Sequence, residues 1–456
     1  MSPRRKLRRV LIHVLMISII FACFFTFYYM KRMIPQTLRV VQGQESDVRL
    51  PLPITATLRS GDGKVALAAK KASGSDGVSM SNEVPAPGDA SQEAAGVRTS
   101  DIPADQIHVM LDEGFSLYSE EVGEYTVELE LFGLFSFREI QVEVVEEEMV
   151  VPCGCPIGIY LDMDGILIVG TGQVTDLQGN TSEPAYGLVR SGDYILQVDA
   201  QTVETKEELV AAICDCDGDS VVLTVRRGGQ EIRVEVPVVQ TAADEYKAGI
   251  WVRDDTQGIG TLSYVDRKGR FGALGHGISD SDTGQVIEDE GGLLYDATIR
   301  SVIKGTINGP GSLAGVINYG GSHQLGEIYD NTECGIYGQL SEEAQQRFAS
   351  WECMPIGYRQ EVEMGPAQIR CCVDGEVEDY DIQIIRADMS STGNKGLVIQ
   401  VTDERLLMLT GGIVQGMSGS PIIQDGKLVG AVTHVLVNDP TRGYGIFIEN
   451  MLDAAG

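Results

Sequence analysis

The segment with the clearest chemistry is a short turn near the C-terminus, which reads Gln-Gly-Met-Ser-Gly-Ser-Pro over residues 415–421. A serine between glycines can stand clear of the backbone, and the glycines allow a tight turn in which nearby N–H groups point at one spot. Such a turn can hold the negative oxygen that forms when a hydroxyl attacks a carbonyl group. Ser418 is therefore the candidate nucleophile, and the N–H groups of Gly416 and Ser418 form the candidate oxyanion hole. The alternative is a plain glycine turn between two strands.

A serine hydroxyl is a weak nucleophile, so Ser418 needs a base within hydrogen-bonding reach. The C-terminal region around it holds three of the chain's five histidines: His276, His323 and His434. We favour His276 because it follows a predicted strand, and because the glycines on either side let its imidazole stand clear of the backbone. His323 is expected in a loop. His434 ends the strand after the serine and is expected to face the core or the rim of the site.

The third member of such a site must accept a hydrogen bond from the imidazole and hold its tautomer, which calls for a carboxylate or an amide. Asp403 is a candidate because it ends the strand predicted over residues 397–402, although it lies only 15 residues before Ser418. Three other aspartates stay open on spacing alone: Asp280, Asp282 and Asp388.

Length and composition exclude several classes of protein. The 456 residues exceed the size of about 250 to 300 residues at which a single core usually divides, so we expect two or three folded domains. The net charge of −31 argues against nucleic acid, whose phosphates require a basic surface. The nine cysteines lack the paired C-x-x-C pattern of a zinc site, so we expect no metal and no cofactor.

Residues 1–33 have the pattern of a membrane anchor. A basic N-terminus precedes an apolar run over residues 10–30, which is about long enough to cross a bilayer as a helix, and no A-x-A cleavage box follows. The basic residues before the run outnumber the two after it. This asymmetry places the N-terminus in the cytoplasm and the remainder outside it. The sequence therefore predicts a single-pass membrane protein with a transmembrane signal anchor.

Residues 34–150 form the next predicted domain. Alternating apolar residues, as over 135–145, indicate half-buried strands and hence a small β domain. A stretch rich in Ser, Gly and Ala over residues 57–104 has no apolar period, so we expect a disordered insertion there.

Residues 151–240 resemble a PDZ domain of the bacterial protease type. The resemblance rests on Gly-Asp-Tyr-Ile-Leu-Gln-Val-Asp over residues 192–199 and on the helix that follows, which a capping box opens at Thr205. In that family a peptide adds as a strand beside the segment after the carboxylate loop. The resemblance places peptide binding at a short run of this domain: Ile157, Gly158, Ile159 and Leu161.

Residues 241–456 are rich in glycine and β-branched residues and contain many short predicted strands, which suggests a barrel or sandwich. The order of His276 before Ser418 matches the chymotrypsin arrangement, in which each of two barrels contributes one side of the site. The expected fold is therefore mainly β: a transmembrane helix, a small β domain, a PDZ domain and a chymotrypsin-like double β-barrel.

Two segments carry a resemblance to a known family: Phe-Gly-Ala-Leu-Gly-His-Gly over residues 271–277 and Gln-Gly-Met-Ser-Gly-Ser-Pro-Ile-Ile-Gln over residues 415–424. With the anchor and the PDZ unit, they make the chain similar to the stage IV sporulation protein B peptidase family, over the anchor and roughly residues 105–456. The resemblance implies a serine peptidase with the triad Ser418, His276 and Asp403.

The family resemblance also implies a role in sporulation signalling between the mother cell and forespore membranes. Such an enzyme cleaves itself and then a membrane-bound regulator, so that an intramembrane protease processes pro-sigma-K. The expected partners are that regulator, the chain's own N-terminal region and the membrane. Two other functions stay open: a PDZ-type scaffold with an inactive barrel, and an envelope quality-control protease with broad substrates.

Overall fold

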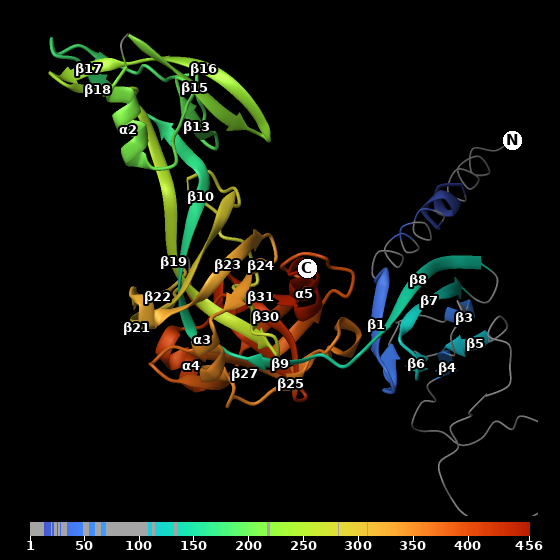
Figure 1. Ribbon diagram of the computed structural model, residues 1–456. Coiled ribbons are helices and arrows are strands. Elements are labelled where there is room, and N and C mark those ends of the chain that lie inside the picture. The colour runs from blue at the N-terminus through green and yellow to red at the C-terminus, as the bar shows by residue number, and fades with distance from the viewer. Residues whose placement is uncertain are drawn as a thin grey trace, which may run out of the picture. The chain divides into compact units, whose positions relative to one another are not determined.

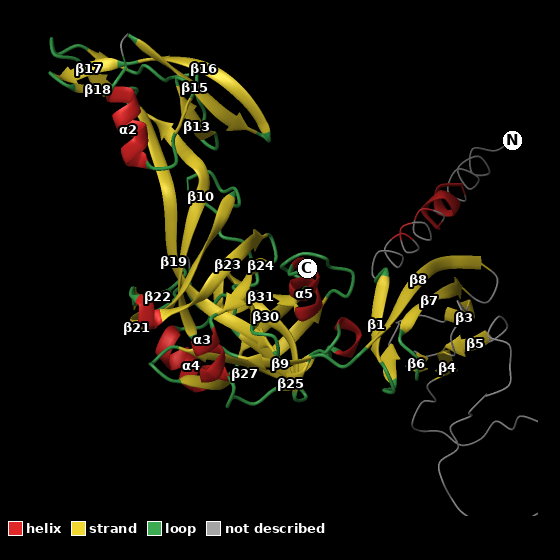
Figure 2. Ribbon diagram, in the orientation of Figure 1, coloured by secondary structure: helices red, strands yellow, loops and turns green. Residues whose placement is uncertain are grey.

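The computed structural model describes most of the chain, and the described residues are mainly strands (Figure 2). They are residues 13–19, 21, 25, 28, 34–48, 54–59, 65–69, 108–111, 115–131, 135–216, 219–280, 282–307 and 309–456. The chain divides into two compact units (Figure 1). The N-terminal unit comprises Met1–Glu148, Ile356–Glu363 and Ala387–Thr392. The C-terminal unit comprises Met149–Pro355, Met364–Arg386 and Gly393–Gly456.

Two small sheets form the N-terminal unit, in the orders β1-β8-β7-β3-β5 and β2-β6-β4. Its elements are β1 (Thr37–Val41), β2 (Ser46–Val48), β3 (Ile54–Arg59), β4 (Val65–Ala69), β5 (His108–Leu111), β6 (Phe115–Ser119), β7 (Gly123–Leu131), β8 (Phe135–Val145) and the 3-10 helix η3 (Arg359–Glu361). Val127 and Leu129 of β7 pack inward with Ile140 of β8, because alternate residues of a strand point to opposite faces. The alternation seen in the sequence over 135–145 thus corresponds to a strand.

The expected membrane anchor is not found. In the part of the chain that the structure describes, no helix is both long and apolar enough to cross a membrane. The predictions of a transmembrane helix and of a single-pass membrane protein are therefore wrong, since a crossing needs about 20 consecutive apolar residues in one helix. Much of residues 1–33 and of the predicted insertion over 57–104 lies outside the described residues. Within the insertion, the end of β3 and all of β4 are strands.

One end of the C-terminal unit is a lobe of strands closed by the helix α2 (Lys206–Cys214), here named the α2 lobe. It contains β11 (Val174–Thr175), β12 (Thr181–Ser182), β13 (Tyr194–Val198), β14 (Gln201–Thr202), β15 (Ser220–Arg227), β16 (Gln230–Pro237), β17 (Val239–Ala242) and β18 (Glu245–Lys247). Thr205 caps α2, and Leu209 and Ile213 point into the core of the lobe, as the sequence predicts. The assignment of this region to the PDZ family stays a prediction.

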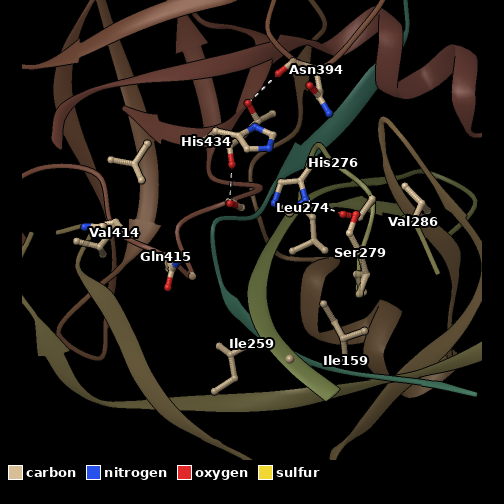
Figure 3. A pocket seen from close by; sticks show the side chains of 18 of the residues that line it. Ile159, Ile259, Leu274, His276, Ser279, Val286, Asn394, Val414, Gln415 and His434 are labelled. Carbon is tan, nitrogen blue, oxygen red and sulfur yellow. Dashed lines mark hydrogen bonds between the residues drawn. The ribbon is translucent and has the colours of Figure 1, made fainter. Parts of the chain in front are cut away.

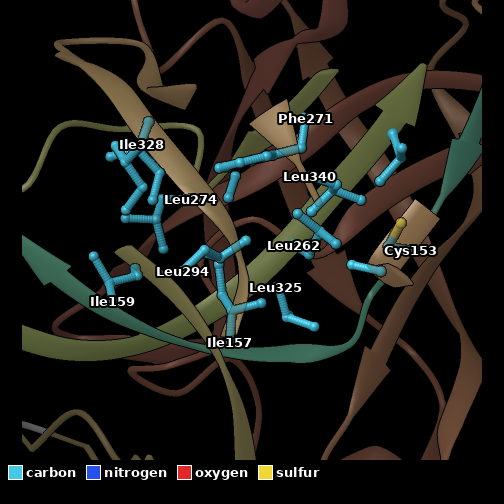
Figure 4. Close-up of a cluster of buried hydrophobic side chains, with 14 of the residues drawn as sticks. Cys153, Ile157, Ile159, Leu262, Phe271, Leu274, Leu294, Leu325, Ile328 and Leu340 are labelled. Carbon is cyan, nitrogen blue, oxygen red and sulfur yellow. The ribbon is translucent and has the colours of Figure 1, made fainter. Parts of the chain in front are cut away.

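Two long strands, β10 (Pro156–Thr171) and β19 (Ile250–Asp266), leave the α2 lobe and enter a ring of six strands. The ring runs β10-β21-β23-β24-β20-β19 and closes where β19 pairs with β10. The other strands of the ring are β20 (Arg270–Ala273), β21 (Asp289–Ile303), β23 (Gln324–Thr332) and β24 (Gly335–Leu340). The elements that flank the ring are β9 (Met149–Pro152), β22 (Ser312–Ile317), β25 (Met354–Pro355), α3 (Glu342–Phe348) and the 3-10 helix η2 (Gly321–His323). Apolar side chains such as Ile157, Leu262 and Phe271 fill the ring (Figure 4).

The rest of the C-terminal unit is a closed barrel in the order β26-β27-β28-β31-β30-β29. Its elements are β26 (Gly365–Cys372), β27 (Val377–Ala387), β28 (Leu397–Val401), β29 (Pro421–Gln424), β30 (Lys427–Leu436), β31 (Asp439–Phe447), α4 (Glu404–Thr410) and α5 (Ile448–Ala454). The protein is thus mainly β and contains a closed barrel. The segment with Ser418 leads into β29, and His276 lies just after β20 of the six-stranded ring.

Candidate active site

A cavity of about 740 Å³ brings Ser418 and His276 together, and residues of both the ring and the barrel line it (Figure 3). From the ring come residues 256–259 of β19 and the segment after β20. From the barrel come residues 413–416, Ser418 and the end of β30. The cavity is therefore assembled from segments that lie far apart in the sequence.

The turn around Ser418 depends on its two glycines. Gly416 has φ +99° and Gly419 has φ +96°, values that residues with a Cβ rarely adopt. Gly419 also lies so close to β19 that a Cβ there would be 2.1 Å from the carbonyl oxygen of Thr261. Between them, the Oγ of Ser418 donates to the carbonyl oxygen of Thr433 at 2.7 Å. The candidate nucleophile is thus held by a backbone acceptor.

The same turn carries two backbone donors, the N–H groups of Gly416 and Ser418, and none of the described residues accepts from them. Thr261 anchors the turn, since the Thr261 Oγ1 donates to Gly416 O at 2.8 Å and the Thr261 N–H donates to Ser418 O at 3.1 Å. The carbonyl oxygens of Gly416 and Ser418 therefore both accept hydrogen bonds from Thr261. Both residues line the cavity, so their two N–H groups can serve the oxyanion hole that the sequence predicts.

Ser420 has a different role from its neighbour. It is fully buried, and its Oγ donates to the carbonyl oxygen of Met417 at 2.7 Å. It braces the turn from behind and does not line the cavity.

His276 is positioned by two residues with positive φ, Leu274 at +67° and Gly275 at +69°. Its Nδ1 lies 2.9 Å from the carbonyl oxygen of Gly277. A carbonyl oxygen can only accept, so Nδ1 carries the proton and the lone pair stands on Nε2. Burial lowers the pKa of His276 below its usual 6.5, which keeps the ring neutral at neutral pH. A neutral imidazole with a free Nε2 has the form that a general base requires.

His434, expected at the core or the rim, lies beside His276. The two ring centroids are 5.0 Å apart with the planes tilted by 40° (Figure 3). Its Nδ1 is buried and has no hydrogen-bond partner among the described residues. Burial, His276 and Lys395 together lower the pKa of His434 to about 4. The sequence signal for this neighbour was its position on the strand that follows Ser418.

Asp403 is not brought to His276. It caps α4, and its Oδ1 accepts from the backbone N–H of Arg405 at 2.8 Å. Its Oδ2 pairs with the guanidinium of Arg405 at 3.0 Å, which holds the pKa of Asp403 below its usual value. Among the described residues, the one carboxylate that lines the cavity belongs to Glu333.

The other candidates for the triad also have partners elsewhere. Asp280 and Asp282 both pair with Arg253. Asp388 accepts from the hydroxyl of Ser390 at 2.7 Å. His323 faces Asp296 at 3.5 Å. None of these four candidate residues lines the cavity.

The residues predicted for peptide binding in a PDZ groove lie inside the ring of strands. Ile157, Gly158, Ile159 and Leu161 belong to the first half of β10, which pairs with β19 along one edge and with β21 along the other. The three apolar side chains are buried. With both edges paired, a peptide cannot add as a strand at these residues, because the long pairing of β10 with β19 places them in the ring.

Comparison with known proteins finds one family model that matches the region of the site. Residues 244–452 match the model of a family described as SpoIVB peptidase S55. No curated protein matches the chain significantly.

Two solved structures are similar to part of the chain. One is the inactive form of Rv3671c protease, with 14% identity, a TM-score of 0.25, and coverage of 43% of this chain and 84% of that chain. The other is the active form of Rv3671c protease from M. tuberculosis, with 15% identity, a TM-score of 0.25, and coverage of 44% and 75%.

Proposed function

We propose that this chain is a serine peptidase of the SpoIVB peptidase S55 family, whose model residues 244–452 match, with Ser418 as its nucleophile and His276 as its general base. The observation that carries this assignment is the shared cavity. It joins a hydroxyl on a glycine turn, a neutral imidazole with its lone pair on Nε2, and two backbone N–H groups that have no acceptor among the described residues.

The proposed reaction follows from these groups. The hydroxyl of Ser418 turns from Thr433 O toward His276, which takes its proton on Nε2 as Oγ attacks the substrate carbonyl. The N–H groups of Gly416 and Ser418 stabilise the oxyanion. His276 then gives the proton to the leaving amine, and water hydrolyses the acyl-enzyme with the same base. The hydrogen bond from Ser418 to Thr433 O at 2.7 Å makes the observed arrangement a resting one.

The third position of the site has two candidates. The carbonyl of Gly277 accepts from Nδ1 in the structure and holds the tautomer that the reaction needs. The family resemblance assigns this position to Asp403, which caps α4 in the arrangement observed. A role for Asp403 at His276 therefore requires a rearrangement of the start of α4.

The proposed biological role comes from the family resemblance. We infer that the enzyme acts in sporulation signalling, cleaves its own N-terminal region, and then cleaves a membrane-bound regulator of the protease that processes pro-sigma-K. The match over residues 244–452 supports this role, because it covers the segment with Ser418 and His276.

The test compares Ser418→Ala with Ser420→Ala in the purified protein. Ser420→Ala is the matched control because it removes a hydroxyl two residues away that does not line the cavity. We expect Ser418→Ala to lose about three to six orders of magnitude in kcat, as removal of a serine nucleophile does, and to stop shortening itself. Mass spectrometry of the protein and of a substrate peptide measures both. Undiminished cleavage by Ser418→Ala would exclude Ser418 as the nucleophile.

A further inference from the structure

One peptide group beside the candidate general base makes hydrogen bonds on both of its sides. It is the group between Gly277 and Ile278. Its oxygen lies 2.9 Å from the Nδ1 of His276 and accepts a hydrogen bond from it. Its N–H belongs to Ile278 and donates to the side-chain Oδ1 of Asn331 at 2.8 Å. Because a trans peptide group is planar, with C=O and N–H on opposite sides, the direction of one bond fixes the direction of the other. Asn331 therefore sets how the carbonyl group meets the imidazole.

Asn331 uses both halves of its amide in this place. Its Nδ2 donates to Ile278 O and to Ile287 O, both at 3.1 Å. An asparagine amide has one acceptor oxygen and a nitrogen with two donor hydrogens, so all three bonds fit together, whereas a carboxylate has no donor for the two carbonyl groups. Asn331 is a half-buried residue of β23 and does not line the cavity. It therefore acts on the base through the backbone and not through contact with a substrate in the cavity.

The segment after His276 also packs closely against the next residue of β23. An ideal Cβ at Gly277 would lie 2.5 Å from the carbonyl oxygen of Thr332, so only glycine allows the observed approach. The backbone of Thr332 limits the position of the peptide group, and the amide of Asn331 fixes its orientation.

The rest of this segment is held without Asn331. Asp280 is fully buried and pairs with Arg253 of β19. Ile287 is buried in an apolar cluster of its own. Loss of the Asn331 amide should thus release the peptide group beside His276 and leave the segment in place.

We propose that Asn331 is a positioning residue for the general base, because it orients the peptide group whose oxygen keeps the proton of His276 on Nδ1. The inference rests on the proposed function and adds one residue to it. Without this acceptor a neutral imidazole can carry its proton on either nitrogen, and a ring with its proton on Nε2 cannot take one from Ser418. Asn331 thus does through a peptide group what the third side chain of a triad does directly.

NMR of the protein labelled with ¹⁵N-histidine tests the effect on the tautomer. The ring ¹⁵N shifts at neutral pH show which nitrogen carries the proton, and a His276→Gln variant identifies the signals of His276. We expect the proton on Nδ1 in the wild type and a mixture of the two tautomers in Asn331→Ala. A wild-type ring with its proton on Nε2, or an unchanged tautomer in Asn331→Ala, would overturn the proposal. The wild-type spectrum stands without any variant at Asn331.

Steady-state kinetics on a cleavable peptide test the effect on catalysis. Asn331→Ala should lower kcat about ten- to hundredfold, as a misplaced catalytic group does. KM should change less than about twofold, because Asn331 does not line the cavity. Asn318→Ala is the matched control: Asn318 is also half-buried, its Nδ2 donates to Thr298 Oγ1 at 3.1 Å, and it does not line the cavity. It should keep kcat. Thermal unfolding shows whether both variants are folded at the assay temperature.

The outcomes separate this inference from the proposed function. Loss of cleavage in Ser418→Ala together with full kcat in Asn331→Ala would leave the nucleophile in place and overturn the role of Asn331 alone. Undiminished cleavage by both variants would remove the proposed function, and this inference with it. An equal loss of kcat in Asn318→Ala would show a general effect on the fold and would count against a specific role of Asn331.

Discussion

Gly419→Ala should be one of the most damaging small substitutions in this protein. An ideal Cβ at residue 419 would lie 2.1 Å from Thr261 O and 2.6 Å from the N of Leu274, and both are backbone atoms that cannot turn aside. Two hydrogen bonds lie at this point of contact. The Thr261 N–H donates to Ser418 O at 3.1 Å, and the Leu274 N–H donates to Thr261 O at 3.2 Å. The substitution therefore pushes the nucleophile turn away from β19.

The expected magnitude has two parts. A residue with a Cβ at φ +96° costs about 1–2 kcal/mol. Overpacking against backbone costs about another 1–3 kcal/mol. Gly426→Ala is the matched control: Gly426 has φ +74°, lies near the other end of β29, and has no atom within 4 Å of its ideal Cβ. The free energy of unfolding of Gly426→Ala should fall only by the backbone strain of about 1–2 kcal/mol.

Urea unfolding of both variants measures the free energies, and kcat/KM on a cleavable peptide measures the site. A displacement of the nucleophile by about 1 Å can cost about a hundredfold in rate, so Gly419→Ala should lose activity even where it is fully folded. Gly426→Ala should keep it. Equal unfolding free energies and equal activities for the two variants would refute the close approach of the Ser418 turn to β19.

Three other expectations concern His276, His434 and Asp403. Burial lowers the pKa of His276 below 6.5, so the base stays neutral to lower pH, and the acid limb of kcat/KM should have its midpoint below pH 6.5; a midpoint above that value contradicts the burial. The pKa of His434 is lowered to about 4, so its contribution to stability is fully present above about pH 6.5 and is lost as the pH falls toward 4. The free energy of unfolding of His434→Gln should therefore depend less on pH in that window, and an unchanged slope would show that His434 is solvated. Asp403→Ala should lower the free energy of unfolding by about 1 kcal/mol through loss of the α4 cap, whereas Asp403→Asn, which still caps a helix, should lower it less. Equal losses contradict the capping role, and a large loss of activity in a stable Asp403→Asn protein would assign Asp403 to the triad.

The local backbone of the candidate site could be predicted because it depends on near neighbours in the chain. Gly416 and Gly419 adopt the positive φ angles that a tight turn around Ser418 requires. Gly275 does the same before His276. The helix α2, its cap at Thr205 and its buried face also follow from a local period. These features need only a few residues to be recognised, and the family resemblance rests on the same segments.

Other assignments could not be made from local pattern. Asp403 follows a strand, as the sequence predicts, but its carboxylate caps the helix α4 that begins at the next residue. The sequence predicts that Ile157 and Ile159 begin a peptide groove. In the structure they are buried in a core, because their strand pairs with β19, about 100 residues later, and with β21, which lies further along the chain. The apolar run over 10–30 predicts a membrane span that the described part of the chain does not contain.

By itself, the sequence predicted Ser418 and His276 as the reactive pair, because glycine spacing sets the local backbone that exposes them. Only the tertiary structure decided what surrounds them. The contact of His276 with His434 and the hydrogen bonds of Thr261 to the Ser418 turn join segments that lie far apart in the sequence. Such contacts depend on strand register and on barrel closure, which are set by the packing of the whole core and have no local signature.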